Sequence, residues 1–333
     1  MAIDNQRNYS FDFLKLFYTI IIIIHHSNLL NNVMLRGYIP VEFFFFISGY
    51  FIYSTSKRNI TFIQFVKRRI QKLYPGYLCA FILLLLALLA VGKLSYNAPY
   101  GPLLEVLLLQ NIGIPNSGGV NYAMWYLSVL FYGGGIVFLA IRILRTRWFN
   151  VVGAIIIALT YGFCFFQVHE IEYWDTVFGI FYIPFWRGVS DLIIGMWLYQ
   201  LPKPPTKIGK YVQLITFISS LVLMFIPGKL DFIEIVLIAT LIYSSTTKDV
   251  LLERVGEANI LCHCYEYQYF AYLNHVLAIY GYSFIYEIIA KHIQIPKIIQ
   301  VLALLCIVTF IAYSTKKITN YTVRLLSYAK RKK

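Results

Sequence analysis

The chain has 333 residues and a formal net charge of +14, and 59% of its residues are hydrophobic and 18% aromatic. Its mean hydropathy of +0.67 excludes an ordinary soluble globular protein, and several apolar runs approach the length needed to cross about 30 Å of hydrocarbon. The basic residues lie in the short loops between apolar runs, so the charge indicates membrane topology and not nucleic-acid binding. We therefore expect an all-α, polytopic membrane protein.

The hydropathy pattern predicts about ten membrane-spanning helices. These lie at about residues 11–31, 38–56, 76–96, 122–141, 148–168, 180–200, 209–227, 231–247, 268–290 and 298–316. If the N-terminus is cytoplasmic, the loops on its side hold most of the Lys and Arg residues, as at 57–75 and 142–147. The positive-inside rule then places both termini in the cytoplasm. We expect one membrane-embedded domain over residues 1–320 and a basic cytoplasmic tail over 321–333 that contacts anionic lipid.

Three features stand apart from this pattern. Residues 59–73 favour an amphipathic helix lying on the inner leaflet. Residues 102–112 are apolar but too short to span, which favours an interfacial or re-entrant segment. In the sixth span, Arg187 and Asp191 are four residues apart, and we expect them to form a buried structural pair.

The first span carries polar side chains that a bilayer disfavours. An ionisable group inside a span costs about 2.5–3.5 kcal/mol on insertion scales, so it is a candidate functional residue. At about 100° per residue, Lys15 and His26 lie within about 20° of the same helix face, and Asp12 and Thr19 share that polar stripe. His25 points about 100° away. The stripe predicts a polar path along one face of this helix.

Five short motifs follow one another along the chain. They are Phe11-Asp12-Phe13-Leu14-Lys15 with His26, Val41-Glu42-Phe43-Phe44-Phe45-Phe46-Ile47-Ser48-Gly49-Tyr50, Phe65-Val66-Lys67-Arg68-Arg69-Ile70-Gln71-Lys72-Leu73-Tyr74-Pro75, Trp125-Tyr126-Leu127-Ser128 and Tyr272-Leu273-Asn274-His275. Together they resemble the acyltransferase-3 family of integral-membrane acyltransferases, whose members are mostly bacterial and O-acylate cell-surface polysaccharides. The resemblance covers nearly the whole chain.

The resemblance implies a multi-pass O-acetyltransferase of the bacterial cytoplasmic membrane. Its donor would be acyl-CoA, most simply acetyl-CoA, and its acceptor a hydroxyl of a cell-surface or extracellular glycan or glycolipid. We expect no tightly bound cofactor. We also expect no metal, because the two thiols of Cys262-His263-Cys264 do not have a usual chelate spacing. We expect membrane lipid and a glycan-assembly protein as partners.

Acyl transfer to a hydroxyl needs a base, a group that stabilises the oxyanion, and a donor site. His26 is the candidate base, and Asp12 is expected to pair with Lys15 at i,i+3 and keep it charged near the cytoplasmic mouth. The resemblance implies that the phosphates of acyl-CoA bind Lys67, Arg68, Arg69 and Lys72. It implies substrate contacts by Glu42, Ser48, Trp125, Ser128 and His275. Gly49, beside Ser48, predicts a close approach of two helix backbones.

Two other functions remain open. A polar stripe through a bundle is also typical of a transporter or flippase. A non-catalytic partner in polysaccharide export could retain the same fold. Lys15 and Lys72 stand where the family usually has arginine, and Leu130 and Phe131 stand where many relatives have a glutamate, so this last alternative stays open.

Overall fold

The computed structural model describes residues 7–96, 98–110, 112–114, 119–171, 177–178, 181–289, 291 and 293–331. Apart from a two-residue antiparallel pair, β1 (Val177–Phe178) with β2 (Phe181–Tyr182), the described regular structure is helical. The all-α class predicted from hydropathy is therefore confirmed.

Each of the ten predicted segments corresponds to a long helix. The bounds of these helices are α1 Tyr9–His26, α2 Pro40–Ser56, α3 Phe62–Ala90, α5 Trp125–Ile143, α6 Thr146–Phe163, α7 Ile183–Gln200, α8 Thr206–Leu223, α9 Asp231–Ser244, α12 Gln268–Ile289 and α13 Lys297–Arg331. Shorter elements join them: α4 Gly101–Val106, the 3-10 turn η1 Tyr122–Met124, the π-helical turn η2 Cys164–Val168, α10 Leu251–Gly256 and α11 Asn259–Cys264.

Four helices of the described chain are long and apolar enough to cross a membrane. They extend over Phe62–Ala90, Tyr122–Ile143, Thr146–Gln167 and Lys297–Leu325. Other helices are short or polar: α2 and α9 have 17 and 14 residues, and α1 carries its charged stripe. The chain is thus a membrane protein, and α3, α5, α6 and α13 contain the candidate spans of its described residues.

Helix α3 differs from the prediction in that it is continuous. Residues 59–73 do not form a separate amphipathic helix, because α3 begins at Phe62 and continues through Pro75 to Ala90. Thr61 caps its start in a capping box with Gln64. The helix ends six residues before the predicted end of the span, at position 96, and Gly92 follows with a φ of 65°.

Helices α2 and α7 approach each other closely through two glycines. A Cβ atom at Gly49 would lie 2.0 Å from the backbone oxygen of Leu192, and one at Gly195 would lie 1.9 Å from that of Phe46. Neither position has room for a larger residue without movement of a backbone. The close approach predicted at Gly49 is therefore confirmed.

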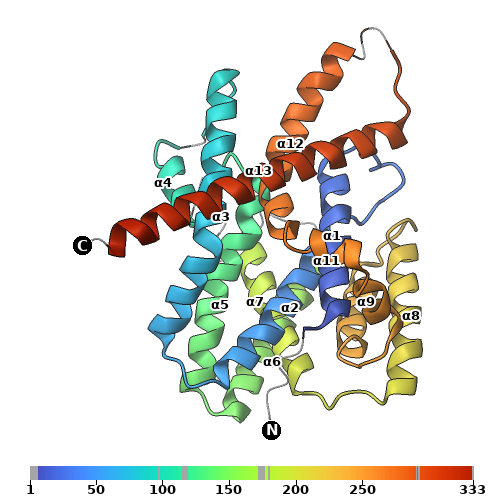
Figure 1. The fold of residues 1–333 in the computed structure, drawn as a ribbon. Coiled ribbons are helices and arrows are strands. Elements are labelled where there is room, and N and C mark those ends of the chain that lie inside the picture. Colours follow the sequence, from blue (N-terminus) through green and yellow to red (C-terminus); the bar gives the residue numbers. More distant parts are fainter. Residues whose placement is uncertain are drawn as a thin grey trace.

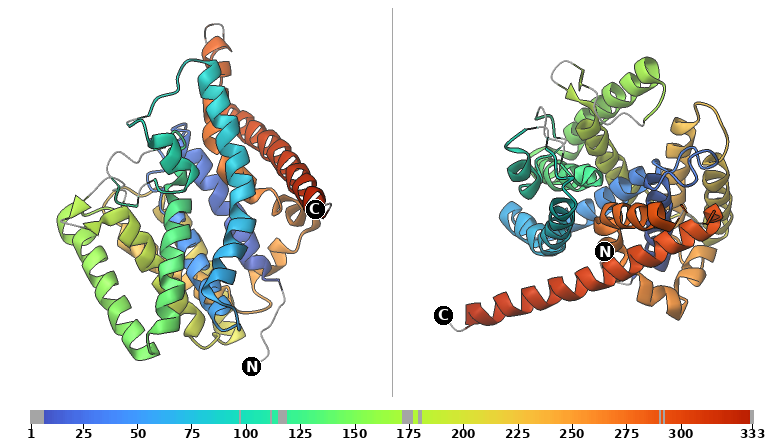
Figure 2. Two further views of the ribbon diagram at one scale, coloured as in Figure 1. Left: turned by 90° about the vertical axis from the view of Figure 1, so that its left-hand side faces the viewer. Right: turned by 90° about the horizontal axis from the view of Figure 1, so that it is seen from above.

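Helices α1 and α2 lie centrally in the bundle (Figures 1 and 2). One apolar core joins α2 to α3, α5, α7 and α12, and a second joins α2 to α1, α7 and α9. Helix α13 crosses α3, and its C-terminal turns extend beyond the bundle (Figure 1). The polar stripe of α1 is thereby enclosed by other helices.

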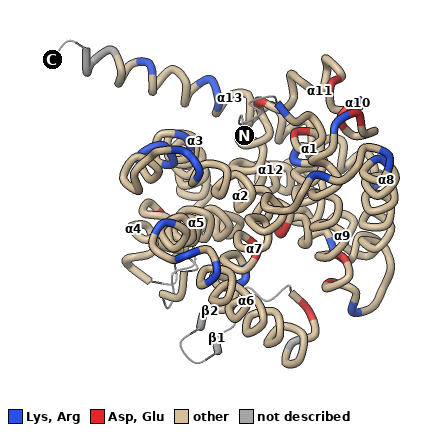
Figure 3. The backbone as a smooth tube through the Cα atoms, turned by 90° about the horizontal axis from the view of Figure 1, so that it is seen from below, with Lys and Arg blue, Asp and Glu red and all other residues tan. Residues whose placement is uncertain are grey.

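Basic residues gather at the end of the bundle where the chain begins. Seen from this end, Lys and Arg segments lie at α3, between α5 and α6, and at α8 (Figure 3). These are the loops that hydropathy and charge assigned to the cytoplasmic side.

Candidate active site

A pocket of about 440 Å³, lined by both apolar and polar side chains, lies at the C-terminal end of α1. Its walls come from α1, the loop after it, α2, η1, α5 and α7. The residues that line it are Ile22, His25, His26, Asn28, Asn31, Tyr38, Val41, Tyr122, Ala123, Trp125 and Arg187. It thus combines two imidazoles, a guanidinium, two amides and several aromatic rings.

The pocket lining includes His26, which contacts His275 of α12. His26 Nδ1 lies 2.7 Å from His275 Nε2, and the two rings are nearly parallel at 12°, with centroids 4.9 Å apart. His275 is completely buried, and its Nδ1 lies 2.5 Å from the carbonyl oxygen of Tyr272. The sequence singled out both histidines, but their direct contact joins positions 249 residues apart and carried no local signal.

The connection between α4 and α5 holds one wall of the pocket against this histidine pair. The ring of Tyr122 meets His26 edge-to-face, with ring centroids 5.4 Å apart. Two hydrogen bonds tie the segment to α12: Tyr272 Oη donates to the Ala123 carbonyl at 2.6 Å, and Asn121 Nδ2 donates to the Leu273 carbonyl at 3.2 Å. Helix α12 therefore supports both His275 and the wall.

Glu105 holds the same connection between α4 and α5 through hydrogen bonds. This buried carboxylate accepts hydrogen bonds from the backbone N–H groups of Val120 and Asn121, each at 3.0 Å, and from the hydroxyl of Tyr96 at 3.0 Å. Glu105 lies within the expected interfacial segment, where the structure has only the short helix α4. This role was not predicted from the sequence, although a lone acidic residue inside an apolar run is a visible signal.

Arg187 brings a buried positive charge to the pocket. Its Nε lies 3.2 Å from Glu42 Oε1, and the two side chains are 6% and 2% exposed. Its guanidinium also covers the ring of Trp125 at 5.1 Å. Arg187 and Asp191 are both buried as expected, but the ion pair of Arg187 is with Glu42 on α2, while Tyr161 donates a hydrogen bond to Asp191. The expected partner was wrong, because α2 approaches α7 so closely.

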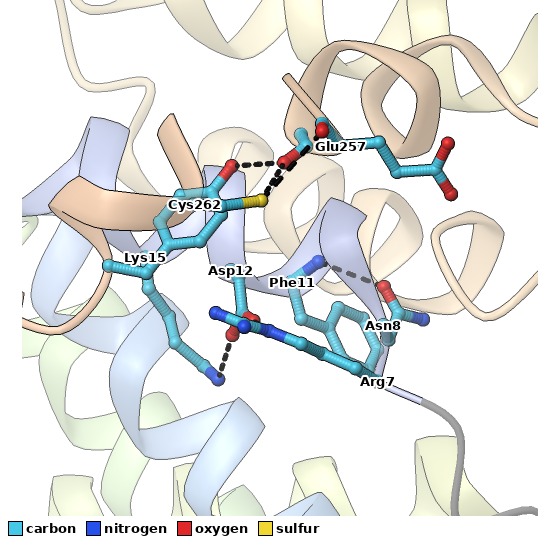
Figure 4. Close-up of polar contacts among 9 residues, drawn as sticks. Arg7, Asn8, Phe11, Asp12, Lys15, Glu257 and Cys262 are labelled. Carbon is cyan, nitrogen blue, oxygen red and sulfur yellow. Dashed lines mark hydrogen bonds and ion pairs between the residues drawn. The ribbon is translucent and has the colours of Figure 1, made fainter. Parts of the chain in front are cut away.

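The opposite end of the α1 stripe carries a separate charged group (Figure 4). Lys15 Nζ lies 3.2 Å from Asp12 Oδ1, which confirms the predicted i,i+3 pair, and Arg7 Nε lies 2.6 Å from Asp12 Oδ2. The hydroxyl of Thr19 donates to the Lys15 carbonyl at 2.8 Å. With a rise of about 1.5 Å per residue, Lys15 and His26 are about 16 Å apart along the axis. The stripe thus contains two distinct sites.

The basic cluster on α3 divides into two kinds of residue. Lys67, Arg68 and Lys72 are exposed. Arg69 is turned inward: its guanidinium donates to the Leu130 carbonyl of α5 and lies 4.8 Å from the centre of the Phe65 ring. Arg69 therefore joins two helices, whereas its neighbours are accessible to a soluble ligand.

Ser48 and Ser128, both predicted to contact substrate, lie between packed helices. Ser48 Oγ is 3.4 Å from Tyr126 Oη, and the buried Ser128 Oγ donates to the Met124 carbonyl at 3.4 Å. Of the residues predicted from the motifs, His26 and Trp125 line the pocket directly, and His275 and Glu42 contact lining residues. Within the described ranges, no group of three His, Cys, Asp or Glu side chains could hold a metal ion.

Comparison with known proteins agrees with these observations. Searches of curated proteins and of solved structures found no match. A family model described as an acyltransferase domain matches residues 8–317, which is nearly the whole chain and includes every pocket residue named above. The protein therefore belongs to the acyltransferase-3 family of membrane acyltransferases.

Proposed function

We propose that this membrane acyltransferase moves an acetyl group from acetyl-CoA in the cytoplasm to a hydroxyl of a cell-surface or extracellular glycan. The observation that carries the proposal is the pairing of His26 with His275 at the pocket. An imidazole held by a second group and facing a pocket has the arrangement of a general base. The finer assignments below rest on this pair and on the charges around it.

The proposed topology has ten crossings and both termini in the cytoplasm. It is supported by the ten long helices and by the basic loops at one end of the bundle. Lys15 then lies near the cytoplasmic face, and the pocket of His26 opens toward the extracytoplasmic side. Donor and acceptor thus approach α1 from opposite ends.

The donor would bind at the cytoplasmic end. Lys67, Arg68 and Lys72 are exposed there, and Lys72 lies within electrostatic range of Lys15. Ammonium and guanidinium groups form strong charge-assisted hydrogen bonds with phosphates. The separation of about 16 Å between Lys15 and His26 requires an extended donor, which the pantetheine arm of coenzyme A provides.

The acceptor pocket suits a sugar. Trp125 and Tyr122 offer flat aromatic surfaces for the apolar face of a sugar ring, and Asn28 and Asn31 offer amides for its hydroxyl groups. In the proposed reaction, His26 takes the proton of the sugar hydroxyl while the oxygen attacks the thioester carbonyl. The new C–O bond forms, the C–S bond breaks, and the proton passes from His26 to the leaving thiolate.

Arg187 is the basic residue of the described pocket lining and is our candidate for stabilising the oxyanion of this reaction. Its ion pair with Glu42 holds the guanidinium in place without adding net charge to the pocket. Glu42 thus acts on the substrate through Arg187.

The test is the acetyl content of surface glycans, measured by mass spectrometry in cells with matched membrane levels of each variant. His26→Ala should lower acetylation by about 10²-fold or more, the usual contribution of a general base. His263→Ala is the control, because His263 is exposed on α11. His25 is unsuitable, since it lines the pocket. Full acetylation by His26→Ala would contradict the mechanism, and a wild-type chain that moves glycolipid without acetylating it would favour a flippase.

A further inference from the structure

The backbone carbonyl of Tyr272 determines the protonation pattern of both histidines. A carbonyl oxygen can only accept a hydrogen bond, so the Nδ1 of His275 that lies 2.5 Å from it must carry a proton. A neutral imidazole has one N–H, and its other nitrogen is an acceptor. The Nε2 of neutral His275 therefore presents a lone pair to His26.

The same reasoning passes to His26. Its Nδ1, 2.7 Å from His275 Nε2, must be the donor of that hydrogen bond. The single proton of neutral His26 is then on Nδ1, and its Nε2 carries the lone pair. Histidine side chains in water favour the opposite tautomer, with the proton on Nε2, which could not accept a proton there.

We propose that His275 is a positioning residue that holds His26 in the Nδ1–H tautomer and so makes His26 Nε2 the base of the reaction. This inference rests on the proposed function, in which His26 takes the hydroxyl proton. The chain of bonds runs from the Tyr272 carbonyl through His275 to His26. His275 itself contacts neither substrate, because it is fully buried behind His26.

A second histidine suits this position in a membrane helix. A carboxylate would orient His26 equally well, but it would place an additional charge inside the bundle at a cost of a few kcal/mol. Neutral His275 supplies the acceptor without that charge. When His26 takes the proton of the substrate, its Nδ1–H becomes a charged donor, and the hydrogen bond to His275 strengthens. The proton stays on His26 until it passes to the thiolate.

The direct test is the ¹⁵N spectrum of protein labelled at its histidine rings, recorded at alkaline pH in lipid. The chain has six histidines, and His26→Gln identifies the signals of His26 by difference. In the wild-type protein we expect a protonated Nδ1 and an unprotonated Nε2 at His26. The opposite pattern would overturn the proposal without any variant of His275.

Variants of His275 separate orientation from packing. His275→Gln keeps an acceptor oxygen near the position of Nε2, whereas His275→Leu removes it. We expect His275→Leu to shift His26 to the Nε2–H form and to lower kcat by about 10²–10⁴-fold, as loss of the correct tautomer does elsewhere, with little change in KM. His275→Gln should restore most of kcat. Wild-type kcat in His275→Leu, or an unchanged His26 spectrum, would overturn the proposal.

A matched control is available on α11. His263 Nδ1 also lies near a backbone carbonyl, that of Asn259 at 2.7 Å, but its side chain is exposed. His263→Leu should leave both kcat and the His26 signals unchanged. If the wild-type protein transfers no acyl group, the proposed function fails, and the tautomer spectrum still decides whether His275 orients His26.

Discussion

Replacing Glu42 with Gln should destabilise the protein, because it leaves the guanidinium of Arg187 buried without its ion partner. The two side chains are 2% and 6% exposed, so water replaces the lost partner only in small part. Removing one member of a buried ion pair costs about 3–5 kcal/mol. Asp191 also interacts electrostatically with Arg187, so we expect the lower end, about 3 kcal/mol, for Glu42→Gln.

The reverse substitution should be worse. Arg187→Gln leaves two buried carboxyl groups, Glu42 and Asp191, without a cation, and we expect about 5 kcal/mol. The double variant Glu42→Gln/Arg187→Gln removes both charges and should recover part of the loss, since two amides can hydrogen-bond to each other. A double-mutant cycle over these substitutions isolates the coupling energy of the pair.

The assay is reversible unfolding in mixed micelles, with the free energy of unfolding taken from helical content. The control is Glu266→Gln, which removes a similar ion pair with Lys316 at a glutamate that is 66% exposed, and it should change stability little. If Glu42→Gln unfolds with a free energy within about 0.5 kcal/mol of the wild-type value, the pair is not a desolvated one and our reasoning is refuted.

Three further experiments test other parts of the structure. Gly195→Ala should destabilise the protein by about 1–3 kcal/mol or more in the same unfolding assay, because its Cβ would meet a backbone oxygen. Gly162→Ala is the control. A Cβ at Gly162 has no atom within 4 Å, so this substitution should be neutral or stabilising. Glu105→Gln should lower the free energy of unfolding by about 1–3 kcal/mol and raise the KM for the acceptor, because it weakens the hydrogen bonds that hold the pocket wall. An unchanged KM for the acceptor would contradict this prediction. Arg69→Gln should lower thermal stability, because Arg69 joins α3 to α5. Lys72→Gln should raise the KM for acetyl-CoA and leave thermal stability unchanged, because Lys72 is exposed. If the two variants have equal thermal stability, the basic cluster does not divide into a structural residue and accessible residues.

The helices and the local contacts could be predicted from the sequence. Apolar runs located ten helices, of which four within the described residues are long and apolar enough to cross a membrane. The pair Asp12–Lys15 followed from helical spacing alone, and the close contact at Gly49 followed from residue size. The continuity of α3 was missed, because charged residues at 67–72 indicated a boundary that the helix passes without interruption.

The contacts that build the pocket could not be predicted in this way. Arg187 had a plausible partner four residues away in Asp191, and only the packing of α2 against α7 shows that Glu42 is its ion partner. Likewise, His26 and His275 each carried a signal, but their contact depends on how α1 and α12 pack. Helical periodicity says which face a residue occupies and does not say which helix covers that face.

The separation of the two histidines along the chain has a consequence for biogenesis. The ribosome must add 249 residues after His26 to reach and include His275, and α12 must then pack beside α1. A nascent chain, or one that ends before α12, lacks His275, so in the proposed mechanism its His26 has no partner to fix its tautomer. Incomplete copies of the chain should therefore lack transferase activity even where their first helices have formed.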